Sequence, residues 1–502
     1  MRSNEGFGIV LRWPMMAVLA ALALTQPAVA TDYHVTVLTD DLENNGNCTL
    51  REAMTASVTN VSVDACPAGE ESDVIMLDTV GTYVFSVLGE FTTDSTESLV
   101  LKGPTAGARA ATINLGFQSR FLVFTGSGYV RLEDLNIAFG VSTGGGGALR
   151  FTDGDLDLSN VGLLFNQAGS QGGALYWKSD QIGDNRELSI ADSEFSGNLV
   201  AGHLPEGGGL FAEADGMGHV LISGSIFDGN TSSSTDPSSP VAGGAGATIE
   251  ARVGAEVEIS DSTFINNEGV LQLDAGTVSG SALEVFLEDS ALLLLTDNQF
   301  LSNTSINASS SSAVDLFTVA QDPAQLVVDR NILAGNEGWQ LNVILNPGGT
   351  GHVSNSLLLG GEIGARILGG GNLTVSHLTV TENDVGILMN GFPGGTAMIN
   401  NSIVTLNGLD FNLPSEVVLL SNLVGVEPEF SDPADGDYRL REGSPAVDMG
   451  NSALPGGGRL DLDKGPRVVG PQTDIGAYEF AAVVFADDFE LGDTQAWSQT
   501  VP

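Results

Sequence analysis

A repeated unit in the middle of the chain constrains its fold more than any other feature. The unit contains a short strand, a turn with the pattern Phe-x-x-Asn, a loop of variable length and often a Gly-Gly pair before a further strand. Its clearest copies recur every 32 to 37 residues, at Phe195, Phe227, Phe264 and Phe300. A fixed turn combined with loops of variable length is typical of a solenoid. We therefore expect an all-β chain that forms a right-handed parallel β-helix over residues 99–425.

The alternation of residues within each strand explains why such units stack. One coil buries its inward apolar side chains only when another coil lies above and below it. Equivalent side chains then lie about 4.8 Å apart, which predicts a stack of phenylalanines inside and a column of asparagines at the turn. We expect these asparagines to adopt the left-handed backbone conformation and to bind neighbouring backbone through their amides. The Gly-rich corners lack the Lys-Ser/Thr pair of a phosphate loop.

The first 30 residues have the pattern of a signal peptide. Arg2 and Arg12 precede an apolar run over residues 15–24, and a small-residue site ends at Ala30. We expect cleavage after Ala30. The alternative is a membrane anchor, but the run is shorter than the about 20 residues that span a bilayer. No transmembrane span is expected in the mature chain.

The charge of the chain limits its partners. The sequence has 63 Asp and Glu against 18 Lys and Arg, a formal charge of −45. Such a surface repels nucleic acid, anionic lipid and polyanionic substrates unless cations intervene. Because 42% of the residues are hydrophobic, we expect a packed core rather than a disordered acidic chain.

An open solenoid exposes strand edges and apolar core at both ends, so we expect covers there. Residues 31–98 are interpreted as an N-terminal cap and residues 426–480 as an Asp/Gly-rich block that closes the other end. Residues 481–502 are interpreted as a tail, either a sorting tag or simply an acidic terminus. Cys48 and Cys66 are the only cysteines. An exported compartment favours a disulfide between them over two free thiols.

Both ends carry motifs with known counterparts. Cys48-Thr-Leu-Arg-Glu-Ala53 resembles the signature of bacterial CSLREA-domain secreted proteins, with Thr in place of Ser. Gly443-Ser-Pro-Ala-Val-Asp-Met-Gly450 and Asp474-Ile-Gly-Ala-Tyr-Glu479 resemble the choice-of-anchor Q region of such proteins. The internal repeats are similar to the passenger repeats of chlamydial polymorphic membrane proteins. These resemblances imply a β-helix that is secreted or attached to the outer membrane of a Gram-negative bacterium, with no assigned reaction.

Three aspartates form the best candidate metal site. Asp153, Asp155 and Asp157 alternate along one predicted strand and therefore face the same side. They are candidate ligands for Ca²⁺, which would relieve their mutual repulsion. We favour the alternative that they form a solvated strand face, accompanied only by Arg150. The aspartates of the C-terminal block are explained singly as turn residues, with a structural Ca²⁺ as the alternative.

A second candidate site combines residues from adjacent coils: Arg366, His377, Glu382 and Asp384. They carry the cation, imidazole and carboxylates that a catalytic site would use. However, His377 occupies a turn position that Asn355 and Asn401 fill in neighbouring coils, which favours a structural role. His203, Glu206 and His219 flank a Gly-rich corner but lack a ligand spacing typical of metal sites.

Three functions are compatible with these features. The leading hypothesis is a non-enzymatic surface or secreted protein that binds a glycan, matrix component or another cell. The alternative is a Ca²⁺-dependent polysaccharide lyase or glycoside hydrolase on the same scaffold, because β-helices present a long face to a polymer. The third is a rigid spacer. Acidic residues in adjacent coils that face a basic residue would favour the enzymatic hypothesis.

Overall fold

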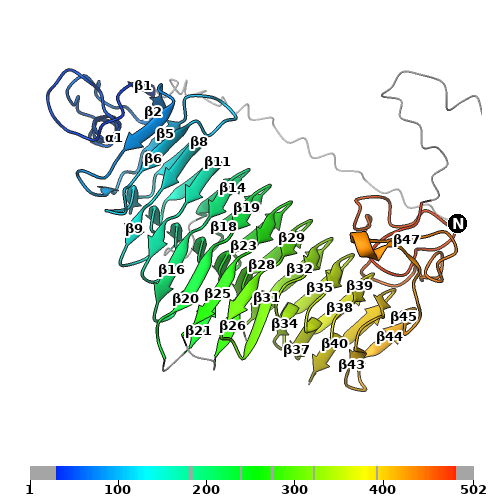
Figure 1. Ribbon diagram of the computed structural model, residues 1–502. Helices are drawn as coiled ribbons and strands as arrows, with labels where there is room; N and C mark the ends of the chain where they lie inside the picture. Colours follow the sequence, from blue (N-terminus) through cyan, green and yellow to red (C-terminus); the bar gives the residue numbers. More distant parts are fainter. Residues whose placement is uncertain are drawn as a thin grey trace, which may run out of the picture.

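The computed structural model describes residues 30–179, 185–237, 240–272, 276–319, 323–391 and 394–481. In these ranges parallel strands wind into one long solenoid (Figure 1). Among the described strands only β46 (Phe430–Asp432) and β47 (Asp437–Leu440) pair antiparallel. The predicted right-handed parallel β-helix is confirmed. The predicted signal peptide, apart from Ala30, and the tail beyond Ala481 lie outside the described residues.

The largest sheet has 25 described strands and forms two adjoining rows along the solenoid. The strands of this sheet are β1 (Ala30–Val35), β2 (Ser72–Leu77), β3 (Gly81–Val84), β5 (Ser98–Lys102), β6 (Ala111–Asn114), β8 (Tyr129–Ala138), β11 (Asp155–Leu164), β14 (Glu187–Ala191), β15 (Glu194–Ser196), β18 (His219–Ser223), β19 (Ile226–Asp228), β23 (Glu256–Ser260), β24 (Thr263–Ile265), β28 (Leu292–Thr296), β29 (Gln299–Leu301), β32 (Gln325–Asp329), β33 (Ile332–Ala334), β35 (Thr350–Ser354), β36 (Leu357–Leu359), β38 (Asn372–Ser376), β39 (Thr379–Thr381), β41 (Ala397–Asn400), β42 (Ile403–Val404), β44 (Val418–Leu420) and β45 (Leu423–Val424).

A second sheet has 14 described strands and lies across the core from the first. Its strands are β4 (Phe91–Thr93), β7 (Leu122–Phe124), β10 (Leu149–Thr152), β13 (Leu175–Lys178), β17 (Leu210–Ala214), β21 (Val241–Gly243), β22 (Ala247–Ala251), β26 (Thr277–Ser279), β27 (Leu283–Leu287), β31 (Ser310–Thr318), β34 (Trp339–Leu345), β37 (Ile363–Gly369), β40 (Val385–Asn390) and β43 (Leu409–Asn412). A third, six-stranded sheet joins the two: β9 (Val141–Ser142), β12 (Gln167–Ala168), β16 (Leu199–Gly202), β20 (Thr231–Ser234), β25 (Glu268–Leu271) and β30 (Thr304–Ile306).

The inward side chains of these sheets form one continuous core along the solenoid. Within it Phe195, Phe227, Phe264 and Phe300 stack ring on ring, with centroids 4.7, 4.5 and 5.0 Å apart. All four are buried. Offset stacking at this distance is favourable for aromatic rings. The predicted phenylalanine stack is confirmed.

A column of buried asparagines runs beside this stack: Asn166, Asn198, Asn230, Asn267, Asn303 and Asn336. The Asn267 side-chain oxygen accepts hydrogen bonds from the backbone and side-chain N–H groups of Asn230, both at 3.0 Å. Its amide donates to the Phe227 carbonyl and to Asn303, both at 2.9 Å.

The expectation that these asparagines are themselves left-handed is wrong. The positive φ belongs to the residue before each one, such as Gly197, Gly229 and Asn266. The tight bend is therefore made one residue earlier, and the asparagine side chain is free to point inward. There it satisfies backbone groups that the corner leaves without a sheet partner.

The CTLREA motif builds the N-terminal cap around helix α1 (Leu50–Thr59). Cys48 and Cys66 form the predicted disulfide. Thr49 and Glu52 form a capping box: the Thr49 hydroxyl accepts from the Glu52 N–H at 3.2 Å, and the Glu52 carboxylate accepts from the Thr49 N–H at 2.9 Å. Such caps satisfy the free N–H groups of the first helical turn.

Arg51 ties this helix to the first coils. Its guanidinium donates to the Asp40 carboxylate at 2.5 Å and to the Gly89 carbonyl at 2.6 Å, and lies 3.9 Å from the Phe85 ring centroid. Arg51 and Asp40 are both buried. Since Leu50 and Ala53 pack in the core, every position of the motif has a structural role.

The C-terminal block lies on the side of the solenoid. Its buried Phe430, Tyr438 and Ile475 pack on the outward residues Leu357 and Ile403 of the largest sheet. Lys464 reaches back to Asp261 at 2.6 Å. The expectation that this block closes the end of the solenoid is therefore wrong, because the outer side of strands β36 and β42 is itself apolar and attracts it.

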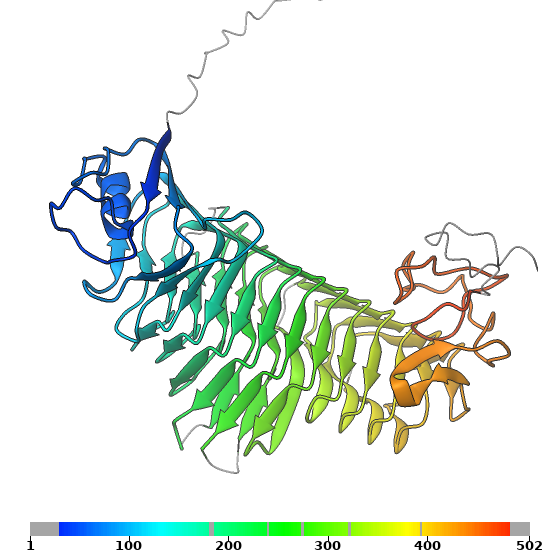
Figure 2. The same ribbon diagram turned by 45° about the horizontal axis from the view of Figure 1, so that its top comes forward.

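The last coil consequently remains uncovered in the described structure. Among the described strands, β43, β44 and β45 each pair only with the strand one coil before, β40, β41 and β42. Figure 2 shows the orange and red C-terminal block beside these last, yellow coils. Val418, Leu419 and Leu420 are all exposed.

No helix in the described ranges is both long and apolar enough to cross a membrane.

Candidate functional site

The outer face of the 14-stranded sheet carries an unusual set of side chains. Residues Leu283, Val285 and Leu287 of β27 point into the core, so the residues between them point outward. Strand register aligns the outward residues in two rows. The first row is Arg150, Tyr176, Phe211, Thr248, Glu284, Asp315, Asn342 and Arg366. The second row is Lys178, Glu213, Glu250, Phe286, Phe317 and Ile344.

A chain of hydrogen bonds follows the first row. Ser279 contacts both Glu284 and Asp315, and its hydroxyl lies 2.7 Å from the Asp315 carboxylate. The Asn342 amide donates to Asp315, and Arg366 donates to the Asn342 side-chain oxygen at 2.8 Å. Glu284 and Asp315 face each other in adjacent coils and are both buried. Buried carboxyls survive on a sheet face only when such a network surrounds them.

Burial changes the protonation of these acids. It raises the pKa of Glu284 well above its usual range, and the neighbouring Asp315 acts in the same direction. Burial also raises the pKa of Asp315, although bonds from Ser279, Ser312 and Asn342 oppose the change. In the second row, burial raises the pKa of Glu250 to about 7, opposed by Arg252. The buried environment therefore favours the protonated form of Glu284.

Aromatic side chains flank the acids along the sheet. Tyr176 stacks on Phe211 with centroids 5.4 Å apart, and Phe286 stacks on Phe317 at 4.9 Å. The Arg366 guanidinium lies 4.3 Å from a ring centroid of Trp339. All except Phe211 are partly exposed. The face thus offers flat apolar surfaces next to hydrogen-bonding groups.

A cavity of about 100 Å³ opens beside these rows. Its wall consists of Leu204, Pro205, Glu206, Val241, Gly243, Glu284 and Phe286. Glu206 and Glu284 thus line the same cavity from different strand corners. Glu206 accepts a hydrogen bond from Gln171 at 2.7 Å. Burial raises the pKa of Glu206, and the bond from Gln171 opposes this change.

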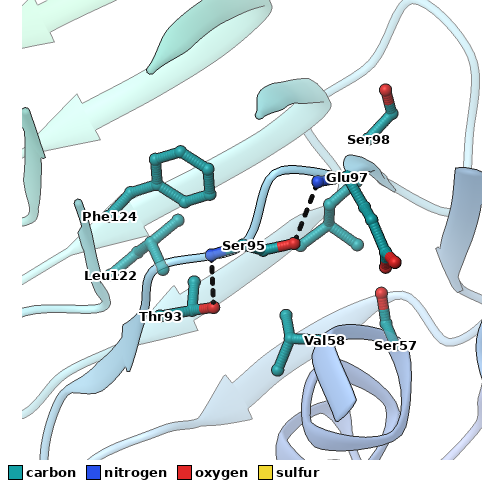
Figure 3. Close-up of a pocket in the computed structure, with 9 residues that line it drawn as sticks. Ser57, Val58, Thr93, Ser95, Glu97, Ser98, Leu122 and Phe124 are labelled. Carbon is teal, nitrogen blue, oxygen red and sulfur yellow. Dashed lines mark hydrogen bonds between the residues drawn. The ribbon is translucent and has the colours of Figure 1, made fainter. Parts of the chain in front are cut away.

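A second hollow, between helix α1 and the first coils, has a volume of only about 10 Å³. Figure 3 shows it lined by Ser57, Val58, Thr93, Ser95, Glu97, Ser98, Leu122 and Phe124. The turn beside it is held by Thr93 and Ser95, whose hydroxyls accept from the N–H groups of Ser95 and Glu97 at 3.2 and 3.1 Å. This volume is about that needed for one water molecule, so we exclude it as a ligand site.

The structure separates the residues of the predicted catalytic site. Arg366 lies on β37 in the hydrogen-bonded chain of the 14-stranded sheet. His377 lies at a corner of the largest sheet, where the C-terminal block covers it and Thr473 contacts its Nε2 at 3.3 Å. Glu382 and Asp384 are exposed at the next corner, and Glu382 accepts from Tyr438. Only Arg366 contributes to the face described above.

His377 has the structural position that its spacing indicates. It shares a positive φ with Asn355 and Asn401 in the coils on either side. Burial and the nearby Arg467 lower the pKa of His377 to about 3. A neutral, buried imidazole beneath another segment is not placed to act as a general base on a polymer.

The three candidate Ca²⁺ ligands also have other partners. Asp157 accepts from Arg131 at 3.1 Å and from the Tyr129 hydroxyl at 3.0 Å. Asp155 pairs with Arg186 at 3.6 Å. In the described ranges, no three His, Cys, Asp or Glu side chains gather in a way that could hold a metal ion. The expectation that all three alternate along one strand is wrong for Asp153, which lies at the left-handed corner before β11 (Asp155–Leu164). Arg131 and Arg186 are cations that sequence reasoning missed.

Sequence reasoning also missed Glu284, Asp315, Asn342 and Glu250. The signal was present in the repeats. Each of these residues directly follows an apolar residue in the strand after a corner, as in Leu283-Glu284, Val314-Asp315 and Leu341-Asn342. Aligning the strands after each Gly-rich corner would have placed these residues in one row. The variable loops hide that register.

Comparisons with known proteins add little to the geometry. No family model matches the chain, and no curated protein does. The crystal structure of pectate lyase Pel9A is similar, with a TM-score of 0.35 and 12% identity, over 91% of this chain and 97% of that chain. A likeness of this size says nothing about activity.

Proposed function

We propose that the protein is exported to the bacterial surface and binds a carbohydrate polymer along the outer face of the 14-stranded sheet. The observation that carries the proposal is the register of that face, which aligns the partly exposed rings of Phe286 and Phe317 with the partly exposed Glu250 carboxyl and Arg366 guanidinium over successive coils. Sugars present apolar C–H faces and a rim of hydroxyls. Aromatic rings pack against the C–H faces. Carboxyl and guanidinium groups form hydrogen bonds with the hydroxyls.

Charge selects among carbohydrates. The face holds Glu206, Glu213 and Glu250, and the whole chain has a formal charge of −45. Polyuronates and sulfated glycans are repelled by such a surface. A neutral or amino-substituted polysaccharide is therefore the proposed ligand. The CSLREA-like and choice-of-anchor Q-like motifs support the proposed location.

Binding to a panel of polysaccharides tests this proposal. The protein from Thr31 onward is titrated with neutral, amino-substituted and acidic polymers by calorimetry. We expect binding of a neutral or amino polymer, weakened at least tenfold by Phe286→Ala and by Phe317→Ala. Phe165→Ala, at an exposed ring on a different corner, is the matched control. Equal binding by all three variants, or no binding to any polymer, would refute the proposal.

Hydrolysis of the bound polymer is a second candidate, favoured by the two carboxyls that line one cavity. Glu284 lines this cavity, and its buried environment favours the protonated form, so it is placed to donate a proton to a leaving glycosidic oxygen. Glu206, which accepts from Gln171, is placed to activate the water that adds to the anomeric carbon. Pairs of carboxyls in different environments perform these two roles in glycosidases.

New reducing ends distinguish hydrolysis from binding. If the second candidate holds, Glu284→Gln and Glu206→Gln abolish their release while polymer binding persists. Glu258→Gln, on an exposed position of β23 in the opposite sheet, leaves the release unchanged. Binding without any new reducing ends removes this candidate and leaves the binding proposal intact.

A further inference from the structure

The C-terminal end of the solenoid is an unfinished core. Leu419 of β44 pairs with Ile399 of β41 one coil earlier and points to the same interior. Ile399 is fully buried, whereas Leu419 is 45% exposed. Leu419 therefore lacks the cover that the next coil gives every preceding residue of its row.

The chain segment at this end is also unprotected. Residues 417–426 read Val-Val-Leu-Leu-Ser-Asn-Leu-Val-Gly-Val, without a charge or a proline. Natural sheet edges are usually guarded by lysine, proline or a bulge, because an open edge pairs with other strands. A neutral, β-forming segment at an open edge has the composition of a pairing site.

The described chain does not supply the missing cover. The C-terminal block packs on the outward residues Leu357 and Ile403, at the side of the last coils. The opposite end of the solenoid is closed, because helix α1 packs there against the core. Among the residues that the structure describes, one end of the rod is thus uncovered and the other is closed.

We propose that two copies of this chain associate end to end through β44. The open edge is self-complementary, because a two-fold axis brings it antiparallel to an identical edge whose free donors and acceptors match. Charge restricts association to this place: two copies that each carry −45 repel one another over most of their surface, and the segment 417–426 carries no charge. Because α1 closes the other end, the assembly stops at a dimer instead of growing into a fibre.

The oligomeric state tests the proposal. The protein from Thr31 onward is examined by light scattering across a range of concentrations and by small-angle X-ray scattering. We expect a dimer whose longest dimension is close to twice that of the monomer. Val418→Lys with Leu420→Lys is expected to raise the dimer dissociation constant at least a hundredfold. Val253→Lys with Ile306→Lys, at similarly exposed apolar positions elsewhere, is the control.

Two further measurements keep the test decisive. The native cysteines are joined in a disulfide, so a Leu420→Cys variant has a single thiol and is expected to form a covalent dimer on mild oxidation. The chain is also compared with one that stops after Ala481. The proposal is overturned if the full chain is a monomer. If the shortened chain then dimerises, the tail covers the end in the full chain. If the shortened chain is also a monomer, the end needs no cover.

Discussion

At the scale of single residues, the corners of the solenoid explain most of the polar residues that resemble catalytic groups. Asn355, His377 and Asn401 share one left-handed corner position in successive coils. Asn267 and its neighbours form the buried column beside the phenylalanine stack. Both sets follow from the repeat, because stacked coils give equivalent residues the same backbone conformation and the same surroundings.

The low pKa of His377 predicts an acid sensitivity. Folding lowers this pKa from 6.5 to about 3, so the unfolded chain takes up a proton that the folded chain excludes. Stability from the neutral imidazole is present above the unfolded pKa and is lost as the pH falls through it. Between pH 6.5 and 5 the loss is about 2 kcal/mol.

His377→Asn, the residue type of the adjacent coils, is expected to remove this loss. Urea unfolding of both proteins at pH 7 and pH 5 measures it. Both proteins keep the charged neighbours Arg467, Asp474 and Glu479. The difference between their pH-dependent losses of stability is therefore the contribution of His377. Parallel pH profiles would contradict the assignment of a buried neutral imidazole.

The asparagine column predicts a large difference between adjacent residues. Asn267→Ala leaves the Phe227 carbonyl and the N–H groups of Asn230 without their partner, which costs about 2 to 4 kcal/mol. Asn266→Gly is expected to change stability by less than about 1 kcal/mol, because Gly197 and Gly229 occupy that left-handed position in other coils. Denaturant midpoints measure both. Equal effects would show that the buried amide has no special role.

At the scale of elements, Arg467 ties the C-terminal block together and links it to the solenoid, beside the apolar contacts described above. Buried Arg467 donates to Asn355 at 3.2 Å and to Glu479 at 2.8 Å. It also donates to the carbonyls of Gly476, Ala477 and Tyr478. Arg467 therefore joins Asn355 of the solenoid to residues 476–479 of the block.

Arg467→Met is expected to release this block. The variant keeps an apolar side chain but leaves the Glu479 carboxylate buried without its cation, a loss of about 3 to 5 kcal/mol. Hydrogen exchange is expected to rise over residues 426–480 and to stay low in the phenylalanine core. Arg439→Met, which breaks the exposed pair with Asp463, costs at most about 1 kcal/mol. Unchanged exchange in the first variant would argue against the anchoring role.

At the scale of the whole molecule, the repeat was enough to predict the solenoid, and two cysteines in a chain expected to be exported were enough to predict its disulfide. The phenylalanine spacing fixes which residues stack, because the turn has a constant length. The row of Glu284, Asp315 and Arg366 was not predicted, because loops of variable length separate those strands in sequence. The lateral position of the C-terminal block was also missed, since its aspartates and glycines specify turns and not the surface beneath them.

The overall charge gives one prediction for the intact protein. Heparin, polyuronates and DNA are expected to show no measurable binding at about 0.15 M salt, and no increase as the salt concentration is lowered. Calorimetry at two salt concentrations measures this. Tight binding of a polyanion that weakens with salt would reveal a basic surface that the composition does not indicate.

The central claim is that the outer face of the 14-stranded sheet binds a neutral or amino-substituted polysaccharide. Hydrogen exchange of the protein from Thr31 onward, with and without such a polymer, tests it most directly. We expect added protection in β27, β31, β34 and β37 and in the corner around Glu206, with none in the opposite strands β23, β28 and β32. Protection confined to the opposite sheet, or absent altogether, would contradict the claim.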